Sequence, residues 1–311
     1  MTKEKLGIIY VIFAGVLWGV IGLFSNQLAA LGATAIQITE SRCLVAAILL
    51  LIVICIKDPK LLKIQIKDFW MFIGTGIISI GFFNICYFQC VEMSTLSIAC
   101  ILLYTGPCFV VLLSALLFHE KIGKQQIICL LLSFLGCIFV SGLFDHGNAR
   151  ITGMGFLIGL GSGFFYGLYS IFGHYALQKY SSYTVTVYTF IVASVGLLPF
   201  CKPMELLAIY QDTTKVGFDL GVIQTTGTYL ILVAILLGIF STTLPFLFYT
   251  KGLEVLDAGK ASIFAFIEPM TATIISICVL KEGMTAFSAV GILLIMVSVV
   301  CMNLKPPSKE H

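Results

Sequence analysis

Two nine-residue segments, 162 positions apart, decide the fold of this chain. They read ACILLYTGP (residues 99–107) and ASIFAFIEP (residues 261–269), and each lies inside a longer apolar run. The same offset, without a gap, aligns further polar and aromatic pairs. These pairs are Tyr87 with Tyr249, Glu92 with Glu254, Ser114 with Ser276, and Glu120 with Glu282. Apolar matches arise easily in such a sequence, so the Tyr, Pro and Glu matches indicate an internal repeat.

The beginnings of the two copies align with a different offset, of 148 residues. Gly15 and Gly19 then match Gly163 and Gly167, and Trp18 matches a tyrosine, Tyr166. The longer polar stretch at 202–226, expected to be a loop and in part an interfacial helix, absorbs the change in offset. We therefore expect one copy in residues 1–150 and a second copy, with a short tail, in residues 151–311.

The composition places both copies in a membrane. Of 311 residues, 59% are hydrophobic and only 11% are charged, whereas soluble domains carry about 25% charged residues. This excludes a soluble enzyme, a disordered chain and a disulfide-stapled module. The apolar segments are continuous runs of about 20 residues, which is typical of membrane helices and not of membrane barrels. Ten runs lie near 6–26, 34–56, 70–91, 95–118, 125–144, 153–175, 183–201, 227–250, 259–280 and 286–304.

Charge predicts the orientation of these ten helices. With the N-terminus inside, thirteen of the 18 Lys and Arg residues fall on the inner side and four on the outer side, as the positive-inside rule requires. We expect a multi-pass protein of the plasma (inner) membrane with both termini cytoplasmic. Because each copy has five helices, an odd number, the second copy enters the membrane from the opposite side.

The predicted fold is therefore an all-α integral membrane protein with ten transmembrane helices in two inverted five-helix repeats. Inverted repeats are typical of alternating-access transporters, whose solute site lies at mid-depth between the repeats. The alternative, an ancient duplication that persists only as scaffold, stays open.

Each half also resembles a known family, the EamA domain of the drug/metabolite transporter superfamily. The resemblance rests on an Ala-rich helix with a central Pro and a Glu about thirteen residues later, at Pro107 and Glu120 and again at Pro269 and Glu282. Arg42, followed by Val45-Ala46-Ala47, resembles the second helix of the family. The resemblance implies a transporter of amino acids or other metabolites, exporting in most members and importing in some.

Prolines interrupt the apolar runs and are candidates for gating kinks. Pro107 and Pro269 occupy matched places, and Pro245 has no partner in the other copy. A helical proline removes one backbone hydrogen bond, so the carbonyls of Leu103 and Ala265 are expected to be freed. The bends would then line the solute path, or serve only to let helices cross.

Four ionisable residues within or near the runs are candidates for charge coupling. A carboxylate at mid-membrane is costly, so Glu268 is expected to face the interior and to bind a proton or a solute amine. Its alternative role is a hydrogen bond to the bent backbone. We favour snorkelling for Lys260, with a counter-charge as the alternative, and an interfacial anchor for Glu40 and Arg42, with an outer gate as the alternative.

Aromatic and amide side chains inside the runs are candidates for a solute pocket. Such residues also form interfacial belts and helix contacts. The predicted substrate-binding residues, with Glu268, are Trp18, Asn84, Tyr87, Tyr104, Tyr166, Tyr169 and Tyr249.

The remaining motifs limit the choice of function. The sequence has no phosphate-binding loop and no His-Glu-x-x-His motif, so we expect no cofactor and no catalytic or metal residues. The net charge of +3 is too small to indicate nucleic acid. The expected partners are a small-molecule solute, the lipid bilayer and protons, with a homodimer left open. Competing functions are an exporter of drugs or hydrophobic cations, a non-transporting scaffold, and an intramembrane lipid enzyme.

Overall fold

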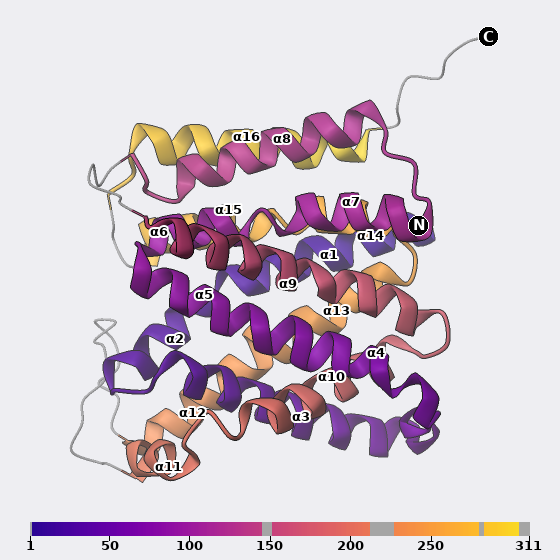
Figure 1. Ribbon diagram of the computed structural model, residues 1–311, viewed down its shortest axis with the longest axis vertical. Helices are drawn as coiled ribbons and strands as arrows, with labels where there is room; N and C mark the ends of the chain where they lie inside the picture. Colours follow the sequence, from indigo (N-terminus) through magenta and orange to yellow (C-terminus); the bar gives the residue numbers. More distant parts are fainter. Residues whose placement is uncertain (1, 145–150, 212–226, 280–282, 305–311) are drawn as a thin grey trace.

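The protein is entirely helical in the residues that its structure describes. The computed structural model describes residues 2–144, 151–211, 227–279 and 283–304. Within these residues, eight helical runs are long and apolar enough to cross a membrane, and two shorter apolar helices complete the ten predicted runs. The helices lie side by side in one bundle (Figure 1). Glu282, the rest of the 202–226 loop from residue 212, and the C-terminal tail lie outside the described residues.

The first repeat contains five helical runs, three of them assembled from shorter pieces. These are α1 (Lys3–Gly19) with α2 (Ile21–Ala30); α3 (Ala35–Lys57); α4 (Phe69–Ile73), η3 (Gly74–Gly81) and α5 (Phe82–Met93); α6 (Leu96–Leu103) with α7 (Gly106–Phe118); and α8 (Lys124–Val140). Two short 3₁₀ turns, η1 (Pro59–Leu62) and η2 (Ile66–Asp68), connect the second run to the third.

The second repeat follows the same order. Its runs are α9 (Gly153–Leu177); α10 (Ser182–Leu197); α12 (Gly227–Gly238), η4 (Ile239–Thr243) and α13 (Leu244–Leu253); α14 (Ala258–Phe264) with α15 (Ile267–Val279); and α16 (Ala286–Asn303). The connection expected at 202–226 begins with a helix, α11 (Pro203–Gln211).

Serine and threonine caps explain where several of these helices begin. The hydroxyl of Thr34 accepts a hydrogen bond from the backbone N–H of Gln37, and the Gln37 side chain returns one to the Thr34 backbone, which makes a capping box. Single caps of the same kind start other runs at Thr95, Thr152, Ser181 and Thr285. Each cap satisfies an N–H group that would otherwise lack a partner at the helix start.

The fourth run of each repeat is broken at the proline motif. α6 ends before Tyr104 and α7 starts at Gly106, with Pro107 in its first turn; α14 ends before Ala265 and Pro269 lies in the first turn of α15. The prediction that the Ala265 carbonyl is freed is wrong. That carbonyl accepts a hydrogen bond from the Glu268 amide at 2.9 Å, because a tight turn replaces the bond lost to proline.

A widened helical turn provides a second matched irregularity. η3 and η4 are π-helical and occupy the same part of the third run of each repeat. Pro245 lies in the first turn of α13, just after η4. π-bulges are frequent at functional sites.

Packing between the repeats follows a two-fold pattern. α1 packs on α13 and α15, while α9, its equivalent, packs on α5 and on α6 and α7. α3 packs on α10, and α8 packs on α16. Exchanging the two repeats leaves this set of contacts unchanged.

Equivalent helices run in opposite directions, so the repeats are inverted. At the start of α8 the Gln125 amide donates to the carbonyl of Leu304 at the end of α16, at 2.8 Å. At the end of α3 the Lys57 ammonium donates to the hydroxyl of Tyr183 at the start of α10, at 3.2 Å.

The beginning of α1 and the end of α16 lie at the same end of the bundle. Glu4 forms an ion pair with Lys260 at the start of α14. Glu120, which precedes α8, accepts hydrogen bonds from the backbone amides of Ala258 and Gly259. α14 therefore contacts both the beginning of α1 and the segment that leads into α8, whose start lies beside the end of α16. The first and last helices thus begin and end at the same end of the bundle, as an even number of membrane crossings requires.

Glycines allow the closest approaches between the repeats. A Cβ on Gly15 would lie 3.4 Å from the Ala265 carbonyl oxygen, and one on Gly163 would lie 3.1 Å from the Leu103 carbonyl oxygen. These are equivalent contacts in the two copies. Gly22, in contrast, has no neighbour among the described residues that its Cβ would meet within 4 Å.

Candidate functional site

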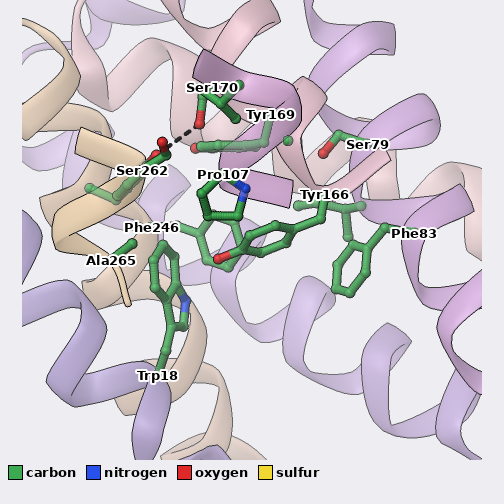
Figure 2. Close-up of a pocket in the computed structure, with 14 residues that line it drawn as sticks. Trp18, Ser79, Phe83, Pro107, Tyr166, Tyr169, Ser170, Phe246, Ser262 and Ala265 are labelled. Carbon is green, nitrogen blue, oxygen red and sulfur yellow. Dashed lines mark hydrogen bonds between the residues drawn. The ribbon is translucent and has the colours of Figure 1, made fainter. Parts of the chain in front are cut away.

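A small internal cavity lies where both repeats meet (Figure 2). Its volume is about 20 Å³, which is room for about one water molecule. Four predicted aromatic residues line it, together with Pro107 and several residues that were not predicted. The aromatic residues are Trp18, Tyr166, Tyr169 and Tyr249.

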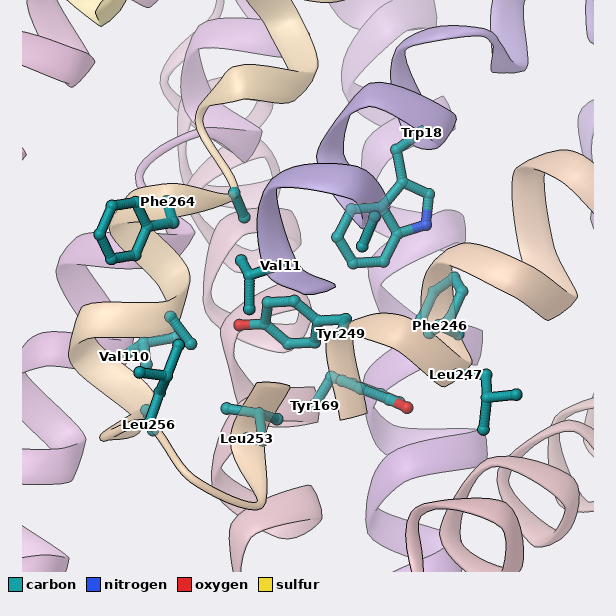
Figure 3. Packing of buried hydrophobic residues seen from close by; sticks show 14 of the residues in the cluster. Val11, Trp18, Val110, Tyr169, Phe246, Leu247, Tyr249, Leu253, Leu256 and Phe264 are labelled. Atoms are coloured by element: carbon teal, nitrogen blue, oxygen red, sulfur yellow. The ribbon is translucent and has the colours of Figure 1, made fainter. Parts of the chain in front are cut away.

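Aromatic side chains fill the space around the cavity (Figure 3). The ring centroid of Trp18 lies 5.1 Å from that of Phe246 and 5.3 Å from that of Tyr249. Tyr169 packs edge-on against Phe246 at 5.1 Å. Edge-to-face arrangements at these distances are favourable. A solute larger than water can enter only if these side chains or their helices move.

The phenol hydroxyls at the cavity are held by neighbouring hydroxyls. Tyr249 and Ser170 share a hydrogen bond of 2.8 Å, and Tyr169 and Thr250 share one of 2.7 Å. These bonds join α9 to α13. They fix the ring orientations and leave hydroxyl lone pairs available to a polar ligand.

Glu268 lies beside the cavity, in the first turn of α15, and contacts two tyrosines. The hydroxyl of Tyr104 lies 3.4 Å from Oε1 and that of Tyr166 lies 3.5 Å from Oε2. Ordinary O–H···O bonds measure about 2.8 Å, so the carboxylate is loosely held. Tyr166 connects it to the cavity, which the same ring lines.

α3 carries two buried charged groups. Glu40 is 3% exposed and Arg42 is 7% exposed, so both side chains are packed within the protein, and the roles expected for them, an interfacial anchor or an outer gate, stay predictions. Glu40 Oε1 accepts a hydrogen bond of 2.7 Å from the Ser194 hydroxyl on α10.

Asn84 and Tyr87, although predicted as ligand contacts, are not among the residues that line the cavity. The Asn84 amide donates to the carbonyl of Ile80 at 2.7 Å, and its oxygen accepts from Thr39 at 3.1 Å. The Tyr87 hydroxyl lies 3.2 Å from Cys100 Sγ. Both therefore connect helices in this conformation.

Lys260, Pro245 and Pro269 do not line the cavity either. Lys260 pairs with Glu4 at the end of the bundle. Pro245 lies in the first turn of α13, next to η4, and Pro269 lies in the first turn of α15.

The sequence analysis missed several cavity residues, of which Phe246 and three serines are the most informative. They are Ser79, Ser170, Phe246 and Ser262. One signal was available: Ser79 and Ser241 match under the offset of 162 and lie in the two π-helical segments. Phe246 had no such signal, since it matches Asn84 in the other repeat.

These features define a class of protein: a multi-pass helical membrane protein with two inverted repeats and a site at their interface. The comparison with known families identifies it further. The model of the EamA-like transporter family matches residues 5–142 and 153–304. The chain therefore belongs to the EamA-like transporter family and contains two EamA domains.

Individual relatives agree with this assignment. The chain is 24% identical to the uncharacterized inner membrane transporter YicL of Salmonella typhimurium over 98% of its own length and 97% of that protein. It is 25% identical to an uncharacterized transporter of Archaeoglobus fulgidus, over 76% of this chain and 78% of that one. A solved crystal structure with 16% identity superposes with a TM-score of 0.75 over 96% of each chain, which shows the fold.

Proposed function

We propose that the protein is a secondary transporter of small organic solutes, amino acids or related metabolites, and that it works as an exporter by alternating access. The observation that carries the proposal is the placement of Glu268 at the interface of the inverted repeats, beside an aromatic cavity. The two tyrosine contacts to its carboxylate are long, so a solute ammonium can replace them without breaking strong bonds.

Alternating access requires the site to open to each side in turn. The cavity holds only about 20 Å³, so we interpret this conformation as one closed around the site. The broken helices α6–α7 and α14–α15 and the π-helical segments supply bends near the cavity about which helix groups can move. Broken helices at a midplane site are typical of secondary transporters.

We further propose that the protein exchanges solute for protons at Glu268. A buried carboxylate without a cation is costly, so in the absence of solute it takes up a proton. Solute and proton then compete for one group, which couples their movements in opposite directions.

The orientation that we propose places both termini in the cytoplasm of a plasma membrane. Lys57, Lys251 and Lys260 lie at the end of the bundle where α1 starts. A concentration of basic residues on one side favours the cytoplasmic face.

A hydrophobic organic cation is the second candidate cargo. The faces of Trp18 and Tyr166 at the cavity, with Glu268 beside them, form a site of the kind that binds quaternary ammonium groups through cation–π contacts.

Counterflow in proteoliposomes tests the proposed function. The unaltered protein is expected to exchange a labelled amino acid or organic cation, with a flux that depends on pH. Glu268→Gln is expected to abolish that pH dependence, because a neutral amide does not titrate and lacks the negative charge that pairs with an ammonium. Glu205→Gln, which alters an exposed glutamate paired with Lys202, serves as the control. Unchanged flux and pH profile in Glu268→Gln would contradict the coupling role, and no counterflow of any solute would contradict transport.

A further inference from the structure

A second and larger pocket lies at one end of the bundle, between the two repeats. Its wall comes from residues 63–68, around η2, and from the turn that joins α9 to α10. α4, which continues from η2, starts on the side of the bundle where the N-terminus lies (Figure 1). The volume of the pocket is about 540 Å³, and volumes of roughly 300–1,000 Å³ are typical of ligand sites.

A buried carboxylate organises this pocket and connects the repeats. Asp68 is 3% exposed. One of its oxygens accepts a hydrogen bond from the Lys179 ammonium at 2.6 Å, and the other accepts one from the Tyr180 hydroxyl at 2.8 Å. The same hydroxyl accepts a hydrogen bond from the backbone N–H of Gln65 at 3.0 Å. These bonds hold both walls in place, so the pocket is preformed.

The lining of the pocket carries an excess of positive charge. Lys63, Lys67 and Lys179 line it together with a single acid, Asp68, which pairs with Lys179. Lys63 and Lys67 are exposed, and neither forms an ion pair within the part of the chain that the structure describes. Two uncompensated ammonium groups in one pocket attract an anion, and a phosphate group can accept hydrogen bonds from both.

The apolar side chains beside the pocket indicate that the anion belongs to a lipid. Ile66, between the two lysines in the chain, is 93% exposed, and Phe69 and Trp70 on α4 are 39% and 46% exposed. Tryptophan at the end of a membrane helix is typical of the headgroup level of the bilayer. A phospholipid presents its phosphate and its acyl chains together, whereas a free phosphate would gain nothing from these apolar groups.

We propose that this pocket binds the headgroup of an anionic phospholipid, with the phosphate at Lys63, Lys67 and Lys179 and the acyl chains beside Ile66 and Trp70. Basic pockets between membrane helices bind anionic headgroups in this way. Because the first repeat supplies two of the lysines and the second repeat supplies the third, the bound lipid joins the repeats at this end. The binding does not depend on the proposed transport function, so either can fail without the other.

Native mass spectrometry of the purified, full-length protein measures the affinity for single lipid molecules. The probes are dioleoyl phosphatidylglycerol, which is anionic, and dioleoyl phosphatidylcholine, which has the same chains and no net charge. We expect phosphatidylglycerol to bind at least tenfold more tightly. Glycerol 3-phosphate, which lacks acyl chains, is the probe for a free phosphate. We expect it to bind at least tenfold more weakly than phosphatidylglycerol, because buried chain carbons add to the affinity.

Variants then assign the headgroup to the pocket. The double variant Lys63→Gln with Lys67→Gln is expected to lower the affinity for phosphatidylglycerol at least tenfold, because each lysine close to an anionic lipid contributes several-fold. Its affinity for phosphatidylcholine should not change. The matched control is Lys121→Gln with Lys124→Gln, which removes two exposed lysines at the same end of the bundle and should keep the preference. Thermal melting without added lipid checks that both variants fold.

Four results would overturn the proposal. They are equal affinity for the two phospholipids, a preference that Lys63→Gln with Lys67→Gln retains, an equal loss of preference in the two double variants, and glycerol 3-phosphate that binds as tightly as phosphatidylglycerol. The third result would mean that any lysines at this end attract anionic lipid. The fourth would mean that the pocket binds a free phosphate.

Discussion

The two helix breaks, one in each repeat, have nearly the same backbone and very different chemistry. α6–α7 breaks next to Tyr104 and α14–α15 breaks next to Phe266, its equivalent. Two residues further on, the first repeat has Gly106 and the second has Glu268. The comparison teaches that duplication supplied a symmetric scaffold, whereas the charge that the proposed mechanism needs was placed on one side only.

Packing against α9 explains why the first repeat has Gly106 where the second has Glu268. A Cβ on Gly106 would lie 2.7 Å from the ring of Tyr166 and 3.0 Å from the carbonyl oxygen of Gly163 on α9. α9 thus covers the first break closely and presents Tyr166 to the second. The space that Gly106 leaves in the first repeat is occupied by the ring of Tyr166 from the second repeat.

The largest effect is expected when the charge is placed in the wrong repeat. Gly106→Glu forces a carboxylate against α9 and should destabilise the fold by more than about 3 kcal/mol, because overpacking and an unpaired buried charge add. Size-exclusion chromatography and thermal melting in detergent measure this. Glu268→Gly, the reverse change, should fold and lose solute affinity. A Gly106→Glu protein with normal melting would contradict the asymmetry.

The next effect concerns the matched glycines. Gly15→Ala and Gly163→Ala should each lower the free energy of unfolding by about 1–3 kcal/mol, because each new methyl group meets the opposite repeat. Gly22→Ala is the matched control, since it has open space and alanine is the better helix former. Thermal melting of the three variants provides the measurement. Equal melting of all three would show that the two-fold contacts do not stabilise the fold.

A smaller effect is expected from the hydroxyls at Glu268. Tyr104→Phe makes the first break identical to the second at that position, and Tyr166→Phe removes the other contact. Each should weaken solute affinity by about 0.5–1.5 kcal/mol with little change in melting temperature. Titration of each variant with the solute measures the change in affinity. A loss confined to Tyr166→Phe would mean that only the cavity-lining tyrosine orients the carboxylate.

The smallest effect is expected at the pair of equivalent helices α8 and α16. The Ser133 hydroxyl donates to Ser298 at 2.7 Å, and interhelical hydrogen bonds in membranes contribute about 0.6 kcal/mol. A double-mutant cycle with Ser133→Ala and Ser298→Ala measures the coupling. A value of several kcal/mol would show that polar contacts, and not close packing, hold this pair together.

Sequence reasoning located the helices well and the site only in part. Apolar length and the repeat predicted each of the ten runs to within a few residues, and the matched aromatic pair Trp18 and Tyr166 lies at the cavity. Tyr87 and Asn84 are not among the residues that line it, although their sequence environment is similar. Arg42 is buried within the protein, and its role as an interfacial anchor or an outer gate stays a prediction.

The sequence by itself determined the number of helices, their inversion and the positions of the two proline breaks, because the bilayer fixes the length of an apolar run and proline cannot continue the hydrogen bonding of a helix. The π-helical segments were not predicted, and η3 contains no proline. Only the tertiary structure decided which side of each helix faces the site. These helices are apolar all round, so no polar stripe marks the inward face. Close packing at Gly15 and Gly163 is what brings Glu268, Tyr104 and Tyr166 together.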